Sequence, residues 1–137
     1  IITLHCPYNK NTHHLINKGN IKKIKKGALL INTARGGLIE TDALVKALDS
    51  SILSGAGLDV LEEECFVNED KEVMSKHFPK ECDLKIIIEN HILAKRENVI
   101  VTPHNAFNSI EALQRILDTT IENIKCFLKG KAVNKVN

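Results

Sequence analysis

The sequence has few aromatic residues, little net charge and no long apolar run. It contains no tryptophan, one tyrosine and four phenylalanines, which disfavours a base-stacking surface for nucleic acid. The formal net charge of +2 is too small to indicate nucleic acid or a membrane surface as a partner. No run reaches the roughly 18 apolar residues of a membrane span. These absences predict no nucleic-acid partner and no membrane partner.

Cysteine and histidine spacing gives no sign of a metal centre. The four cysteines are scattered without a C-x-x-C pair, which predicts neither a metal site nor a disulfide framework and indicates the reducing cytoplasm. The adjacent His13 and His14 are expected to project in different directions, so no metal site is predicted there. A basic cluster within residues 22–26 is interpreted as the solvated face of a short helix.

The rest of the composition is that of one globular domain. The chain has 137 residues, 43% hydrophobic and 26% charged, which is enough for one hydrophobic core. Short apolar runs alternate with helical patterns, which predicts an α/β fold with a mostly parallel sheet. The predicted strands are Ile1–His5, Ala28–Asn32, Gly55–Val60 and Asn98–Thr102. Because the chain begins within a strand-like run and not with methionine, we expect it to be a piece of a longer polypeptide.

The segments between the strands differ in character. The uninterrupted Leu and Ile residues of 28–32 predict that both faces of the sheet are covered. Thr41 is the predicted N-cap of a helix. Residues 61–90 are polar and irregular, so we expect only short helices there. A long helix with apolar residues at three- and four-residue spacing is predicted from Asn108, with Glu111 completing a capping-box-like start.

Three predicted strands end in conspicuous polar groups. Arg35 follows the second strand, Asp59 to Glu64 the third, and His104 the fourth. Because the carboxyl ends of parallel strands line one edge, we expect these groups to converge. Arginine matches a carboxylate bidentately, and histidine paired with a carboxylate suits proton transfer. The pattern suits chemistry on a small organic acid, but taken alone it is not specific, and surface arginine, strand-end aspartate and packed histidine fit it better.

Three motifs in order carry a family resemblance. NTARGGLIETDALVKAL (32–48), GAGLDVLEEE (55–64) and NVIVTPHNAF (98–107) resemble the D-isomer-specific 2-hydroxyacid dehydrogenase family. HCPYNKNTHHLI (5–16) is similar to a segment just past the midpoint of that family's cofactor domain. The resemblance is weakest between residues 65 and 95. It implies an α/β fold, namely the C-terminal half of a Rossmann-type NAD-binding domain with mostly parallel strands, followed by a long C-terminal helix.

The resemblance also implies a division of the chain. Residues 1–107 would form the second half of the NAD-binding domain, and residues 108–137 the helix that returns to the substrate domain in the full-length family. The Gly-rich first half of the cofactor domain is not found here, because Gly55 and Gly57 precede Asp59 without a third glycine or a following helix. The full-length protein would be a homodimer.

Roles for individual residues follow from the same resemblance. Arg35 matches the arginine that holds the substrate carboxylate, and His104 matches the histidine that protonates the carbonyl oxygen as NADH delivers hydride to carbon 2. Glu64 matches the glutamate that pairs with this histidine. The positions that match NAD contacts are Cys6, Pro7, Thr12, Thr33, Ala34, Arg35 and Asp59, with Asp59 beside the nicotinamide carboxamide.

Two questions stay open at the level of sequence. Glu62, Glu63 and Glu64 are consecutive, so spacing alone does not decide which of them faces His104. Phe107 is typical of the D-lactate and D-2-hydroxyisocaproate dehydrogenase group, which favours a 2-oxo acid such as pyruvate or a branched analogue. The alternative from another class is an NADH-sensing corepressor, or another non-catalytic binding protein, on the same scaffold.

Overall fold

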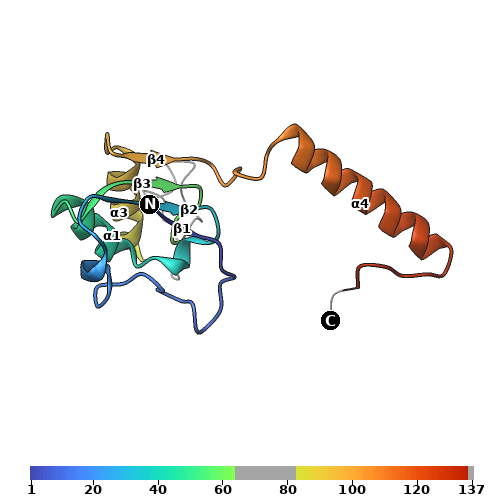
Figure 1. Ribbon diagram of the computed structural model, residues 1–137, viewed down its shortest axis with the longest axis horizontal. Coiled ribbons are helices and arrows are strands. Elements are labelled where there is room, and N and C mark those ends of the chain that lie inside the picture. Colours follow the sequence, from blue (N-terminus) through green and yellow to red (C-terminus); the bar gives the residue numbers. More distant parts are fainter. Residues whose placement is uncertain (64–82, 136–137) are drawn as a thin grey trace, which may run out of the picture. The chain divides into compact units, whose positions relative to one another are not determined.

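The computed structural model describes residues 1–63 and 83–135. The chain divides into two compact units, Ile1–His104 and Asn105–Asn137. The second unit contains one long helix, α4 (Ile110–Leu128) (Figure 1). The described elements of the first unit are β1 (Ile2–Leu4), η1 (Ile21–Lys23), β2 (Ala28–Asn32), η2 (Gly36–Leu38), α1 (Thr41–Asp49), β3 (Leu53–Leu58), α3 (Leu84–Ala94) and β4 (Val99–Val101).

The four described strands form one parallel sheet in the order β1-β2-β3-β4. The predicted α/β class and parallel sheet are therefore confirmed. Pairing places Leu30 level with Ala56, and Ala56 level with Val99. All three are buried, so this row belongs to the core. The helices α1 and α3 contact each other and the strands β3 and β4, respectively (Figure 1).

The opposite face of the sheet is less covered than predicted. Thr3, Ile31, Gly57 and Ile100 form one row across the four strands, and none of them is buried. Ile100 is 70% exposed. The apolar strands predicted that both faces of the sheet are covered. Within the described residues of the first unit, only one face is covered.

The start of α1 differs from the prediction. Thr41 is the first helical residue, and Glu40 precedes it without a capping bond from its own side chain. The Thr41 N–H and hydroxyl both donate to Oε2 of Glu62, at 3.1 and 2.7 Å. Thr41 as N-cap was therefore wrong, because a carboxylate 21 residues further along the chain accepts the hydrogen bonds that a cap would accept.

The helix α3 was not predicted. Its eleven residues begin within the segment 61–90, for which only short helices were expected, and continue beyond it. Asp83 is its N-cap and accepts from the Lys85 N–H at 2.8 Å. Ile87 and Leu93 face the core, but the apolar residues continue around the helix, so no amphipathic period stands out.

The start of α4 lies one residue later than predicted. Its N-cap is Ser109, whose hydroxyl accepts from the Ala112 N–H at 3.2 Å. Asn108 lies before the cap, and its N–H donates to the Asn105 carbonyl at 2.8 Å. The long C-terminal helix itself is confirmed. Among the described residues, no helix combines the length and apolar content needed to cross a bilayer.

Candidate active site

The carboxyl ends of the four described strands lie at one edge of the sheet, because all four are parallel. Cys6 lies two residues beyond β1, Arg35 three beyond β2, Asp59 one beyond β3, and His104 three beyond β4. The predicted convergence of these strand ends at one edge is therefore present in the fold. Ligands of parallel sheets bind outside this edge.

Asp59 is fixed at the centre of the edge by its two neighbouring strands. It is 5% exposed. Its N–H donates to the Asn32 carbonyl at 2.9 Å, and its Oδ1 accepts from the Thr102 hydroxyl at 2.5 Å. The Thr102 N–H also donates to the Leu58 carbonyl at 2.9 Å. Thr102 thus ties the segment that leads to His104 to the segment that carries Asp59.

The Asn32 side chain holds the loop that carries Arg35 through two hydrogen bonds. This asparagine is fully buried, donates to the Arg35 carbonyl at 2.8 Å and accepts from the Ala34 N–H at 3.1 Å. The Arg35 side chain is exposed, and its Nη1 donates to the Ala34 carbonyl at 2.7 Å. A guanidinium presented in this way is accessible to an anionic ligand.

Gly36 brings the Arg35 loop against the loop that follows Asp59. A Cβ atom at Gly36 would lie 1.9 Å from the Leu61 carbonyl oxygen and 2.4 Å from the Glu62 nitrogen. Only glycine permits this backbone approach. A Cβ at Gly37 would likewise lie 2.8 Å from the Tyr8 ring. The two glycines of the motif therefore allow contact with two different loops of the edge.

The three consecutive glutamates separate in space. Glu62 is engaged by Thr41 and by His14, whose Nε2 lies 2.5 Å from Glu62 Oε1. Glu63 accepts from the Asp83 N–H at 2.7 Å. Glu64, the predicted partner of His104, lies outside the described residues. His104 is exposed, has a left-handed backbone (φ 52°), and its N–H donates to the Thr102 carbonyl at 2.9 Å.

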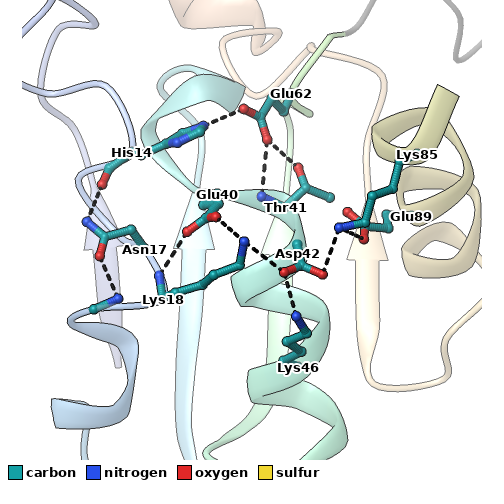
Figure 2. Close-up of polar contacts among 11 residues, drawn as sticks. His14, Asn17, Lys18, Glu40, Thr41, Asp42, Lys46, Glu62, Lys85 and Glu89 are labelled. Carbon is teal, nitrogen blue, oxygen red and sulfur yellow. Dashed lines mark hydrogen bonds and ion pairs between the residues drawn. The ribbon is translucent and has the colours of Figure 1, made fainter. Parts of the chain in front are cut away.

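The sequence did not predict the contact that His14 makes with Glu62. Its N–H donates to the Gly37 carbonyl at 2.8 Å while its ring reaches Glu62 (Figure 2). The expectation that the adjacent histidines diverge was wrong, because the His13 and His14 rings stack at 3.8 Å. The left-handed backbone of His14 (φ 48°) departs from the regular backbone for which divergent side chains are expected.

The predicted cofactor residues other than Asp59 lie on the loops after β1 and β2. Cys6 and Ala34 are half-buried and pack against the core, whereas Pro7 and Thr33 are exposed. The Thr12 hydroxyl donates to the Pro7 carbonyl at 2.8 Å and accepts from the Asn9 N–H, so it closes the loop after β1. A groove on the same loop is lined by Tyr8, Asn9, Lys10 and His13, none of which is a predicted cofactor contact.

A charged network lies beside the His14–Glu62 contact (Figure 2). Asp42 accepts from Lys46 at 2.7 Å, and Lys18 and Lys85 also contact it. The Lys46 hydrogen bond, followed by those of the other two lysines, holds the Asp42 pKa well below its usual range. Burial raises the pKa of Glu89, against the opposing effect of Lys85. The network links the loop after β1, α1 and α3.

Comparisons with known protein sequences point to one family. Residues 1–106 match the family model described as "D-isomer specific 2-hydroxyacid dehydrogenase, NAD binding domain". A glyoxylate reductase from Thermofilum pendens is 40% identical over 96% of this chain and 32% of the relative. A D-specific alpha-keto acid dehydrogenase from Enterococcus faecium is 43% identical over 90% of this chain and 36% of the relative.

The fold comparison points to the same family. The crystal structure of D-lactate dehydrogenase from Aquifex aeolicus, complexed with NAD and lactic acid, has a TM-score of 0.75 and 40% identity, and it covers 94% of this chain and 37% of that one. The present chain thus spans about a third of the length of the relatives it matches. The chain belongs to the D-isomer-specific 2-hydroxyacid dehydrogenase family and matches the NAD-binding domain of that family.

Proposed function

We propose that this chain works as part of a longer NAD-dependent D-2-hydroxyacid dehydrogenase, which interconverts a D-2-hydroxy acid and its 2-oxo acid. Residues 1–107 would supply the second half of the NAD-binding domain, and 108–137 the helix that returns to the substrate domain. The observation that carries the proposal is the placement of Arg35, Asp59 and His104 at one sheet edge in a chain that matches this family.

The residues at the edge fit a bound nicotinamide cofactor. Asp59 offers a carboxylate acceptor held by Thr102, and Thr33 is exposed at the end of the neighbouring strand. When bound, NADH supplies the hydride that the carbonyl carbon receives. Asp59 would orient the carboxamide, and Cys6 and Thr12, with the other predicted contacts on these loops, would border the cofactor.

The protein's own side chains would bind the acid and move the proton. Arg35 would hold the substrate carboxylate through paired N–H donors and polarise the 2-oxo group. Protonated His104 would donate its proton to the carbonyl oxygen as carbon 2 receives hydride, which yields the hydroxyl and a neutral imidazole. Glu64 would hold the imidazolium, and the engagement of Glu62 by His14 and Thr41 supports Glu64 over Glu62 for this role.

The open face of the sheet supports a longer parent protein. Parallel sheets are normally covered on both faces, and Ile100 and Leu29 of this sheet are 70% and 42% exposed. The missing first half of the cofactor domain would cover such a face and supply the Gly-rich pyrophosphate turn. We expect residues 1–137 alone to bind NADH weakly at most, which isothermal titration calorimetry can measure. Tight binding by these residues alone would contradict this.

The finer parts of the proposal concern substrate, assembly and compartment. Phe107, three residues after His104 in HNAF, favours pyruvate or a branched 2-oxo acid as substrate. The parent enzyme would be a homodimer. The scattered cysteines without C-x-x-C pairs favour the reducing cytoplasm. A corepressor on the same scaffold is the competing function, and peptide binding without turnover would favour it.

Steady-state oxidation of NADH by the full-length protein, with pyruvate and 2-oxoisocaproate as substrates, tests the proposed function. His104→Gln should lower kcat about 10²- to 10⁴-fold. Arg35→Ala should lower kcat and also raise the KM for the 2-oxo acid, because it removes the carboxylate clamp. His91→Gln, an exposed histidine on α3, is the matched control and should retain full activity. Unchanged kcat in His104→Gln would rule out the proposed proton donor.

A further inference from the structure

We propose that His14 and Glu62 form a positioning pair, which holds the predicted cofactor loop (residues 6–14) against the loop that follows β3 (residues 59–63). This inference rests on the proposed function, since the two loops matter to catalysis only in a dehydrogenase. Neither side chain was predicted to contact substrate or cofactor. Their role would be to keep other residues in place.

Both carboxylate oxygens of Glu62 form hydrogen bonds, and each has a different partner residue. Oε1 lies 2.5 Å from His14 Nε2, and Oε2 accepts from the N–H and hydroxyl of Thr41 (Figure 2). The Glu62 side chain is only 11% exposed and that of His14 30%. A partly buried, charge-assisted contact of this kind holds geometry better than an exposed ion pair does.

His14 is itself anchored at both its backbone and its ring. Its N–H donates to the Gly37 carbonyl at 2.8 Å, two residues beyond Arg35. Its φ of 48° lies in the left-handed region, which few residues other than glycine adopt and in which asparagine, aspartate and histidine are enriched. Histidine therefore suits this backbone, and its ring is long enough to reach Glu62 from it.

The pair lies close in sequence to the predicted functional residues of both loops. Thr12 lies two residues before His14, and Glu64 lies two residues after Glu62. Asp59 lies three residues before Glu62 and is anchored by separate bonds to Asn32 and Thr102. Loss of the pair should therefore loosen the cofactor loop first and leave Asp59 held by its own partners.

The test uses three variants of the full-length enzyme. His14→Asn tolerates the left-handed backbone but is too short to reach Glu62. His14→Gln places an amide donor near the position of Nε2 and should restore the contact. Lys18→Met is the matched control, because it breaks an ion pair of 2.7 Å between Glu40 and the segment that follows the predicted cofactor loop without touching the His14–Glu62 contact.

The readouts are the KM and Kd for NADH and the kcat at saturating NADH, because KM and Kd do not depend on the fraction of protein that is folded. His14→Asn should raise both constants about tenfold, the effect of losing one hydrogen bond to a charged group, with a smaller change in kcat. His14→Gln should lie near the wild type, and Lys18→Met should equal it.

The outcomes separate failure of the positioning pair from failure of the proposed dehydrogenase function. Unchanged NADH constants in His14→Asn, or an equal rise in Lys18→Met, would overturn the positioning pair while the dehydrogenase function stands. A wild-type protein that binds NADH but turns over no 2-oxo acid would overturn the proposed function, and weaker NADH binding by His14→Asn would still support the pair. A wild-type protein that does not bind NADH would overturn both.

Discussion

Replacing Gly36 by alanine should separate the loop that carries Arg35 from the loop that follows Asp59. The new Cβ would lie 1.9 Å from the Leu61 carbonyl oxygen, where ordinary contact begins at 3.4 Å. One backbone must therefore move by about 1.5 Å, since the atoms that clash are main-chain atoms. Overpacking of this kind costs about 1–3 kcal/mol of folding free energy.

A displacement of this size should be more damaging to catalysis than to folding. Misplacement by about 1 Å can cost about 100-fold in rate, so kcat/KM for NADH-dependent reduction should fall by about that factor in Gly36→Ala. Gly19→Ala is the control, because its Cβ would meet only the Asn17 side chain at 3.1 Å. Absorbance at 340 nm follows turnover, and thermal unfolding of the same samples follows stability. Wild-type kcat/KM in Gly36→Ala would refute the requirement for this close approach.

Two further substitutions test the groups around the edge. Thr102→Val removes the hydroxyl that donates to Asp59 at 2.5 Å, and loss of a hydrogen bond to a charged group costs about 1.5–3 kcal/mol. The KM for NADH should rise, and Thr102→Ser should restore it. An unchanged KM would show that Thr102 does not place Asp59. Glu89→Gln should raise the Tm of the full-length protein at pH 8, because burial raises the Glu89 pKa and the fold therefore favours the protonated form. That gain should vanish as the pH falls below about 4.3, the unfolded value, and a lower Tm at pH 8 would show that the Lys85 ion pair outweighs burial.

The strands were predictable because their cause is local. β2 spans the predicted residues 28–32, since an uninterrupted apolar run is typical of a buried parallel strand. α3 was not predicted, because its sequence has no comparable local pattern. Exposed Ile88 and buried Glu89 lie side by side on it, so its hydrophobic pattern shows no clear face. The Asp83 cap was the one local sign that a helix begins there.

The site was predictable only as far as strand ends determine it. Parallel topology places Arg35, Asp59 and His104 at one edge once the strands are known. The contact between His14 and Glu62 spans 48 residues, and the one between Thr102 and Asp59 spans 43. No spacing rule connects residues so far apart, and the predicted glutamate, Glu64, lies outside the described residues.

Hydrogen bonds add to apolar packing in holding the loops of this edge together, since Val60, Leu61 and Leu38 are buried there while polar side chains join one loop to another. Glu62 is the clearest case, since one carboxylate caps α1 through Thr41 and holds the cofactor loop through His14. The side chains of Arg35 and His104 are instead exposed at the edge. Their replacement should therefore abolish chemistry and leave the loops in place, whereas replacement of Glu62 should disturb the helix start and both loops together. His104 and Glu62 can therefore be told apart by whether cofactor affinity falls along with the rate.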